Sequence, residues 1–145
     1  MPIPPRVSVV ALRTADLTRS TAFYTALGWE LSAASTPAMS MFKTAGSLLL
    51  VYSDTLLAEL GGKEVAAALA GQANGKAVLP IHVATDDEVD AAVQQAASAG
   101  GVVKPASPTP LGGSHTFFAD PDRHLWEVIH HPLYRPGADG RPQIP

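Results

Sequence analysis

The residues of this sequence that could move a proton or bind a metal are its five histidines and thirteen carboxylates, because the chain contains no cysteine. The lack of cysteine excludes disulfide scaffolds, thiolate zinc sites and cysteine nucleophiles. His82, His115 and Glu127 lie in three different predicted strands. His130 and His131 are adjacent at a predicted strand end, where neighbouring side chains point to opposite faces, so they do not predict a metal clip.

The first third of the chain predicts one strand, one helix and three further strands. Asp16 is a candidate N-cap, because its carboxylate can accept from the free N–H groups that begin a helix. Gly28 is typical of a helix end. The predicted elements are a strand at 7–12, a helix at 17–27 and strands at 29–33, 38–43 and 47–53.

The same order recurs about 70 residues later, which indicates a structural repeat. The elements are a strand at 79–84, a helix at 89–99 with Thr85, Asp86 and Asp87 as cap candidates, and strands at 102–104, 114–119 and 124–130. The sequence therefore predicts a single domain over 1–145 with two βαβββ modules (6–53 and 78–131), a helical linker (54–77) and a flexible tail (133–145). The linker helix is expected to break at Gly61-Gly62, before a polar loop at 71–75. We expect the tail, rich in Pro and Gly, to be mobile or draped on a neighbour.

Composition narrows the class of protein. The 145 residues are 46% hydrophobic with a net charge of −3, which is typical of a folded domain. A pI near 5.9 with scattered basic residues argues against a nucleic-acid partner. No apolar run reaches the roughly 20 residues of a membrane span. The start of the chain lacks the pattern of a signal peptide, so we expect a cytoplasmic protein without a membrane partner.

Two stretches resemble the vicinal oxygen chelate superfamily, which includes glyoxalases, bleomycin- and fosfomycin-resistance proteins and extradiol dioxygenases. ADLTRSTAFYTALGW at 15–29 is similar to the opening module, and FADPDRHLWEV at 118–128 is similar to the closing hairpin. The resemblance implies an α+β fold in which two βαβββ modules form half-barrel sheets around a cavity, with the helices outside. Arg123 stands where the family usually has glycine. Either this arginine takes a positive φ or the turn differs.

The resemblance also implies where a metal would be bound. Family ligands are His, Gln or Glu on the first and last strands of each module, and the corresponding residues here are Val9, Leu50, Pro80 and Glu127. Only Glu127 can bind a metal, which needs at least three protein ligands for useful affinity. We therefore expect no cofactor at this position.

Strand alternation, started from these positions, predicts the side chains that face the cavity on their strands, and on the strand before Glu127 the resemblance implies that His115 and Phe117 face it. They are Val9, Leu48, Leu50, Tyr52, Pro80, His82, His115, Phe117 and Glu127. Alternatives remain open: Glu127 pairs with an arginine or with backbone N–H groups, or a register slip of one residue exposes His82 or His115. Trp126 is predicted to be a core residue, and Trp29 is ambiguous.

The leading hypothesis is a glyoxalase/bleomycin-resistance-like protein that binds a small, partly aromatic molecule in an apolar cavity. Glu127, His82 and His115 would orient the ligand. One alternative is a metal-independent lyase, isomerase or hydrolase that uses Glu127 and a histidine as acid and base. Another is a lyase or dioxygenase with a divalent metal on a displaced set of His82, His115 and Glu127. A purely structural role is least favoured. We expect a homodimer, because bare sheet edges promote aggregation.

Overall fold

The computed structural model describes residues 3–70 and 76–143, so the predicted loop at 71–75 lies outside the described residues. The elements are β1 (Val9–Thr14), α1 (Leu17–Ala26), β2 (Glu30–Leu31), β3 (Met39–Lys43), β4 (Leu48–Ser53), α2 (Asp54–Ala70), β5 (Val78–Val83), α3 (Asp86–Ser98), β6 (Val102–Val103), β7 (Ser107–Pro108), β8 (Ser114–Ala119) and β9 (Leu125–His130). None of the described helices is both long and apolar enough to cross a membrane.

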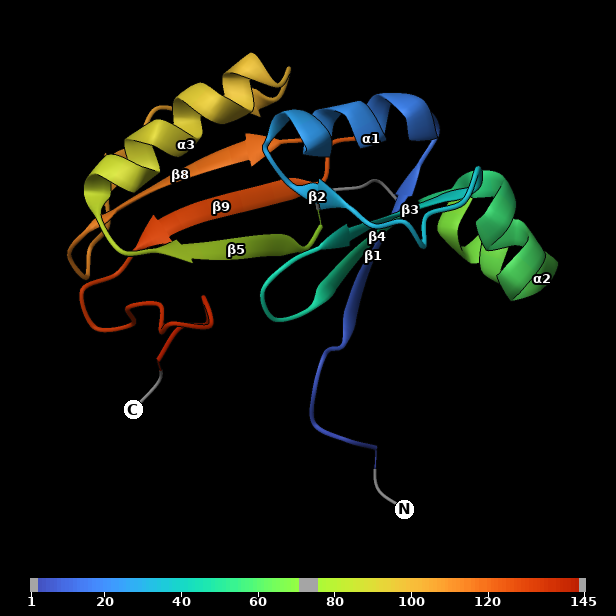
Figure 1. Ribbon diagram of the computed structural model, residues 1–145, viewed down its shortest axis with the longest axis horizontal. Helices are drawn as coiled ribbons and strands as arrows, with labels where there is room; N and C mark the ends of the chain where they lie inside the picture. The colour runs from blue at the N-terminus through green and yellow to red at the C-terminus, as the bar shows by residue number, and fades with distance from the viewer. Residues whose placement is uncertain (1–2, 71–75, 144–145) are drawn as a thin grey trace.

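The strands form two separate mixed sheets, each from one half of the chain. The first has the order β1-β4-β3-β2 and the second β5-β9-β8-β6, with the short β7 paired to β8. In each sheet the first and last long strands of the module run parallel, as β1 with β4 and β5 with β9. The α+β class with its repeated module is confirmed, and the described sheets do not close into a barrel. Figure 1 shows α1 and α3 along the same side of the two sheets.

The helices begin and break where their local chemistry requires it. The Asp16 carboxylate accepts from the Arg19 N–H at 3.0 Å, so the predicted cap is confirmed. Thr85 caps α3 through a capping box with Glu88. The break in α2 occurs at Gly62, whose φ of 70° leaves the helical region.

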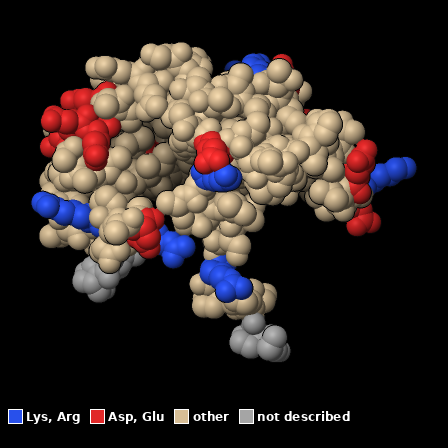
Figure 2. Space-filling view, in the orientation of Figure 1, with Lys and Arg blue, Asp and Glu red and all other residues tan. Residues whose placement is uncertain are grey.

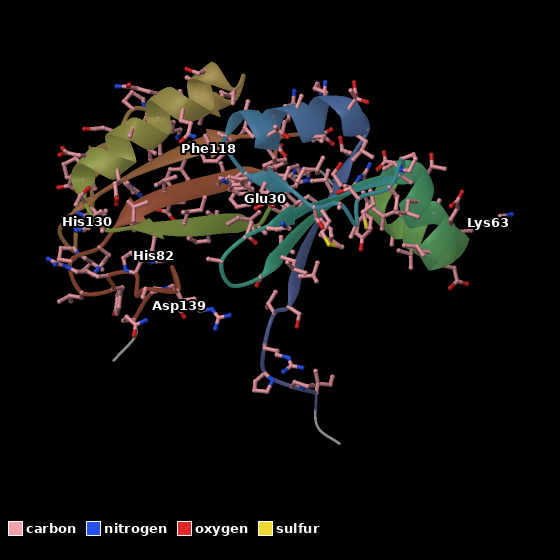
Figure 3. All side chains as sticks on the ribbon, in the orientation of Figure 1. Glu30, Lys63, His82, Phe118, His130 and Asp139 are labelled. Carbon is pink, nitrogen blue, oxygen red and sulfur yellow. The ribbon has the colours of Figure 1, made fainter. Side chains whose placement is uncertain are left out.

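The core lies between the helices and the sheet faces beneath them. It is rich in aromatic side chains, with Phe23, Tyr24 and Phe42 at most 2% exposed. Phe118 stacks on Trp126 with ring centroids 6.1 Å apart, and Figure 3 shows Phe118 beneath α3. Trp126 is 6% exposed and belongs to this core, as predicted.

The turn between β8 and β9 connects the two modules. Arg123 adopts a φ of 69°, so this arginine takes the conformation that glycine has elsewhere in the family. The Asp120 carboxylate accepts from the backbone N–H groups of Asp122 and His124, which holds the turn in shape. Asp122 in turn accepts from the hydroxyls of Thr14 and Ser20 in the first module, each at 2.6 Å.

The described part of the tail folds back on the chain. Pro136 and Pro142 form an antiparallel bridge, and the Gly137 N–H donates to the Arg141 carbonyl at 2.8 Å. Gln143 donates to the Arg135 carbonyl at 3.0 Å, closing a small hairpin over residues 135–143. We call this segment the tail hairpin.

Candidate functional site

The face of the second sheet that turns away from α3 carries the polar residues of interest. Register pairs Pro80 with Glu127 and Glu127 with Phe117, so these three side chains form a row across β5, β9 and β8. The next row along the strands is His82, Ile129 and His115. Glu127 therefore lies diagonally between His82 on one neighbouring strand and His115 on the other. Figure 3 shows His82 on the side of β5 opposite to α3.

His115 and Glu127 form a hydrogen-bonded pair. Nδ1 of His115 lies 2.7 Å from Oε1 of Glu127, and the two side chains are 25% and 17% exposed. The His115 ring also meets Phe117 edge to face, with centroids 5.2 Å apart. When Nδ1 carries the proton, the carboxylate fixes the ring and Nε2 is left as an acceptor or base. The partner of Glu127 is thus an imidazole rather than the arginine considered above.

His82 has a different environment on the other side of Glu127. Burial lowers the pKa of its imidazole below the ordinary value of 6.5. The Glu127 carboxylate opposes this shift, whereas His131 lowers the pKa further. The neutral imidazole is therefore the dominant form at neutral pH, which suits a hydrogen-bond acceptor or a base.

His131 is a residue of this region that the sequence did not single out. It is 5% exposed, and its Nδ1 accepts from the Leu133 N–H at 3.1 Å. Its Nε2 is buried with no hydrogen-bond partner among the described residues. In the sequence, His131 is noticeable only as a second histidine just before Pro132. Strand alternation assigned it to the face opposite to that of His130.

His130 belongs to a separate cluster at the start of α3. Its Nδ1 lies 2.8 Å from Oδ1 of Asp86, and the Ser114 hydroxyl donates to the same oxygen at 2.6 Å. The hydrogen bond from Ser114 and then that of His130 lower the pKa of Asp86. Because serine and histidine both bind the carboxylate, the histidine does not activate the serine as in a nucleophilic triad. This cluster holds the β8 and β9 ends against α3.

The predicted residues of the first sheet share one face. Val9 pairs with Leu48, and Leu50 pairs with both Ala11 and Met41. Tyr52 pairs with Met39 and Arg13 on the same face. Val9 and Leu48 are each 39% exposed, whereas Leu50 is 8% exposed. This face is therefore apolar and partly open.

A pocket of about 900 Å³ lies at the seam between the two sheets; we call it the seam pocket. All four strands of the first sheet line the pocket at the same end of that sheet. The edge strand β5 and Trp126 of the second sheet line it from the other side. Leu48, Pro80 and His82 are the residues of the predicted cavity that line it. The remaining six lie on the two open faces, so the described chain does not gather all nine around one pocket. Figure 2 shows the hollow between the two halves of the molecule.

Trp29 and Leu79, which also pack against the core, line the seam pocket as well. Trp29 stacks on Tyr24 and meets Trp126 edge to face at 5.2 Å. These side chains reach the pocket because the strand ends of the first sheet lie against the edge strand β5 of the second sheet. This arrangement depends on tertiary packing. A smaller pocket of about 580 Å³ shares Trp29 and His82 and extends along α3.

The residues at the family's metal positions do not fit a metal. Val9, Leu50 and Pro80 have no donor atom, and Glu127 is already bound to His115. Leu48 and Ala11, the strand partners of Val9 and Leu50, add only hydrocarbon. Within residues 3–70 and 76–143, no group of three or more His, Asp or Glu side chains is arranged to hold a metal ion.

Several solved structures are similar to this chain over most of its length. The chain is similar to a glyoxalase-related enzyme from Fulvimarina pelagi, with 29% identity, a TM-score of 0.83, and 97% of this chain and 98% of the other covered. A glyoxalase/bleomycin resistance protein/dioxygenase from Nocardioides has 25% identity and a TM-score of 0.74, with 100% and 93% covered. A fosfomycin resistance protein from Listeria monocytogenes shares the fold at 22% identity and a TM-score of 0.67, with 90% and 97% covered.

No curated protein matches the chain. The family model that describes the Glyoxalase/Bleomycin resistance protein/Dioxygenase superfamily matches residues 6–128. This match includes both sheets, the helices between their strands, and the paired residues His115 and Glu127. The chain therefore belongs to the Glyoxalase/Bleomycin resistance protein/Dioxygenase superfamily.

Proposed function

We propose that this protein binds a small, partly aromatic molecule between its two modules, without a metal at the family's metal positions. The observation that carries the proposal is the hydrogen bond between His115 and Glu127, beside Phe117 on an otherwise apolar open face. The Glu127 side chain is 17% exposed, and a polar group buried to this extent needs a hydrogen-bond partner, which His115 supplies. Such a face offers a ligand both stacking area and oriented polar groups.

His82 connects this face to the seam pocket. It lines the pocket together with Pro80 and Leu48, and its imidazole is close enough to Glu127 to respond to the carboxylate. A ligand that occupies the pocket and extends over β5 would meet His82 first and Glu127 next. The pocket volume of about 900 Å³ lies within the range of small-molecule sites.

A second function, metal-independent acid–base catalysis, is favoured by the same pair. An imidazole whose orientation is set by a carboxylate is a common general base, and such a group contributes about 10²–10⁴-fold to turnover. The neutral His82 is a further base on the other side of Glu127. In a lyase or isomerase reaction that begins by removing a proton next to a carbonyl, one of these imidazoles would take the proton, and a hydrogen-bond donor would have to stabilise the charge that develops on the carbonyl oxygen.

The test is a screen of aromatic natural products and hemithioacetal substrates by thermal shift and by product detection. Binding with recovery of the unchanged compound supports a binding protein. In that case Phe117→Ala weakens affinity more than His82→Ala, because a stacked aromatic contact contributes about 0.5–1.5 kcal/mol beyond area burial. Product formation that disappears in Glu127→Gln, with binding intact, would instead establish catalysis.

Metal analysis of the purified protein tests the second half of the proposal. We expect less than one equivalent of metal per chain and no thermal shift with nickel, zinc, manganese or iron. One tightly held equivalent that is lost in Glu127→Ala would contradict it. Val9→Ala is the matched control, since it changes a family metal position without removing a donor.

A further inference from the structure

The seam pocket is closed on one side by the tail hairpin, which lies beyond the residues matched by the family model. Gly140, Arg141 and Pro142 contribute to its wall. The tip of the tail hairpin rests on the β3–β4 turn: a Cβ added at Gly140 would lie 3.1 Å from Cβ of Ala45. A Cβ added at Gly46 would lie 3.7 Å from Nε of Arg141, which places this guanidinium beside the turn.

The charged groups of the seam pocket differ in how firmly they are paired. Lys43 is hydrogen-bonded to Glu30 within the first sheet, and Glu30 also lines the pocket, so this cation stands beside a carboxylate that opposes a bound anion. Arg141 has a looser partner, because its Nε is 3.9 Å from Asp139 and the two side chains are 64% and 58% exposed. Exposed pairs of this kind contribute little, so the guanidinium can exchange Asp139 for another anion at small cost.

Another part of the wall of the seam pocket is aromatic and apolar. Trp29 and Trp126 meet edge to face there, and Leu79 and Pro80 extend the surface along β5. A planar ring fits such a wall. The guanidinium fork of Arg141 matches the geometry of a carboxylate, which it binds through two parallel N–H groups.

We propose that the seam pocket selects a small aromatic anion, a ring that carries a carboxylate, and that Arg141 of the tail hairpin is its specificity-determining residue. This inference rests on the proposed function and adds the charge of the ligand to it. The ring packs against Trp29, which Trp126 supports from the core, and the carboxylate lies at the border of the pocket beneath the tail hairpin. Figure 2 shows charged side chains of both signs around this border.

The experiment uses two probes that differ in charge, 2-naphthoate and its uncharged isostere 2-naphthamide. Both are titrated by calorimetry into the full chain and into the Arg141→Gln, Arg141→Lys and Arg135→Gln variants. Arg135 is the matched control, because it is an exposed arginine on the other strand of the tail hairpin. All variants change exposed side chains, so the fold is retained.

We expect the parent protein to bind naphthoate about tenfold more tightly than naphthamide, as for a hydrogen bond to a charged group. Arg141→Gln removes this preference and leaves naphthamide binding within about twofold, while Arg135→Gln keeps the preference. Arg141→Lys retains part of the preference for naphthoate, and added salt reduces this preference in the parent protein.

Three results would overturn the inference, and they separate it from the proposed function. Equal binding of both probes in the parent and in Arg141→Gln leaves an aromatic site without anion selection. If the parent protein binds neither probe, the pocket does not select an aromatic anion. The wider ligand screen then still tests the proposed function. A preference for naphthoate that survives in Arg141→Gln would assign the anion to another cation.

Discussion

Tyr24 of α1 donates its phenolic hydrogen to Asp120 of the β8–β9 turn, across the boundary between the two modules, at 2.6 Å. The tyrosine is fully buried and the aspartate is 4% exposed. Burial, and then the Asp120 carboxylate, raise the pKa of Tyr24, so the phenol stays protonated and acts as a donor. Trp126 donates to the Tyr24 oxygen at 3.2 Å, and His124 lies 2.8 Å from the same carboxylate oxygen. This buried chain of polar groups makes the two halves of the core one unit.

Removal of this phenol should destabilise the whole domain. Tyr24→Phe keeps the ring packing but deprives Asp120 of a donor and Trp126 of an acceptor. We expect the free energy of unfolding in urea to fall by about 1.5–3 kcal/mol, as for a hydrogen bond to a charged group. Tyr134→Phe, whose ring contacts His131, is the control and should change stability by less than about 0.5 kcal/mol. A parental urea midpoint in Tyr24→Phe would show that the contact does not connect the modules.

Asp122 should make stability sensitive to acid. Burial acts to raise the pKa of this carboxyl, but the hydrogen bonds from Ser20 and Thr14 outweigh it, so the net shift is downward. A carboxyl group whose pKa is lowered in the folded state stabilises the fold at pH values above the ordinary pKa of aspartate. This stabilisation is lost as the pH falls through the pKa of the folded state. We expect the unfolding free energy of the parent to drop between neutral pH and about pH 3.

The Asp122→Asn variant tests this dependence on pH. We expect it to be less stable than the parent at pH 7, and its unfolding free energy should fall less steeply as the pH is lowered. Asp90→Asn, on the exposed side of α3, should keep the parental slope. If the slope survives unchanged in Asp122→Asn, the acid sensitivity comes from other groups.

The sequence was sufficient for the features that are decided locally. The Asp16 cap before an apolar run depends on a few neighbouring residues, and the structure has it as predicted. The two-residue β7 was missed because serine and proline, its two residues, are not typical of strands. The seam pocket and the tail hairpin were missed for another reason. They arise where the end of one sheet meets the edge of the other, which no local pattern records.

The hydrogen bond between His115 and Glu127 should appear as an energetic coupling. In a double-mutant cycle with His115→Ala and Glu127→Ala, we expect the effects on unfolding free energy to be non-additive by about 0.5–3 kcal/mol. The matched cycle pairs Glu127→Ala with His82→Ala, because these two residues interact electrostatically between the neighbouring strands β9 and β5. This second coupling should be smaller. Additive effects in the first cycle would show that the contact at 2.7 Å carries no free energy.

The titration of His82 tests the arrangement of the open face directly. Burial is the largest cause of its lowered pKa, and the Glu127 carboxylate opposes it. Removal of that charge in Glu127→Gln should therefore lower the pKa of His82 further, as measured by NMR of the imidazole protons. His131→Phe should raise it, because His131 contributes to the lowering. An upward shift in Glu127→Gln would mean that the carboxylate does not act on His82.

The open faces and sheet edges predict a symmetric homodimer. Val9, Leu48 and Val78 are each about two-fifths exposed on these faces, and β1, β2, β5 and β6 lie at sheet edges. Exposed apolar patches and unpaired strand edges favour association with a second copy. Light scattering at micromolar concentration should give twice the mass of the chain. Val9→Glu should shift the protein toward monomer by placing a charge on this face, whereas Leu111→Glu, in the loop before β8, should not. A monomer for the parent protein under these conditions would contradict the prediction.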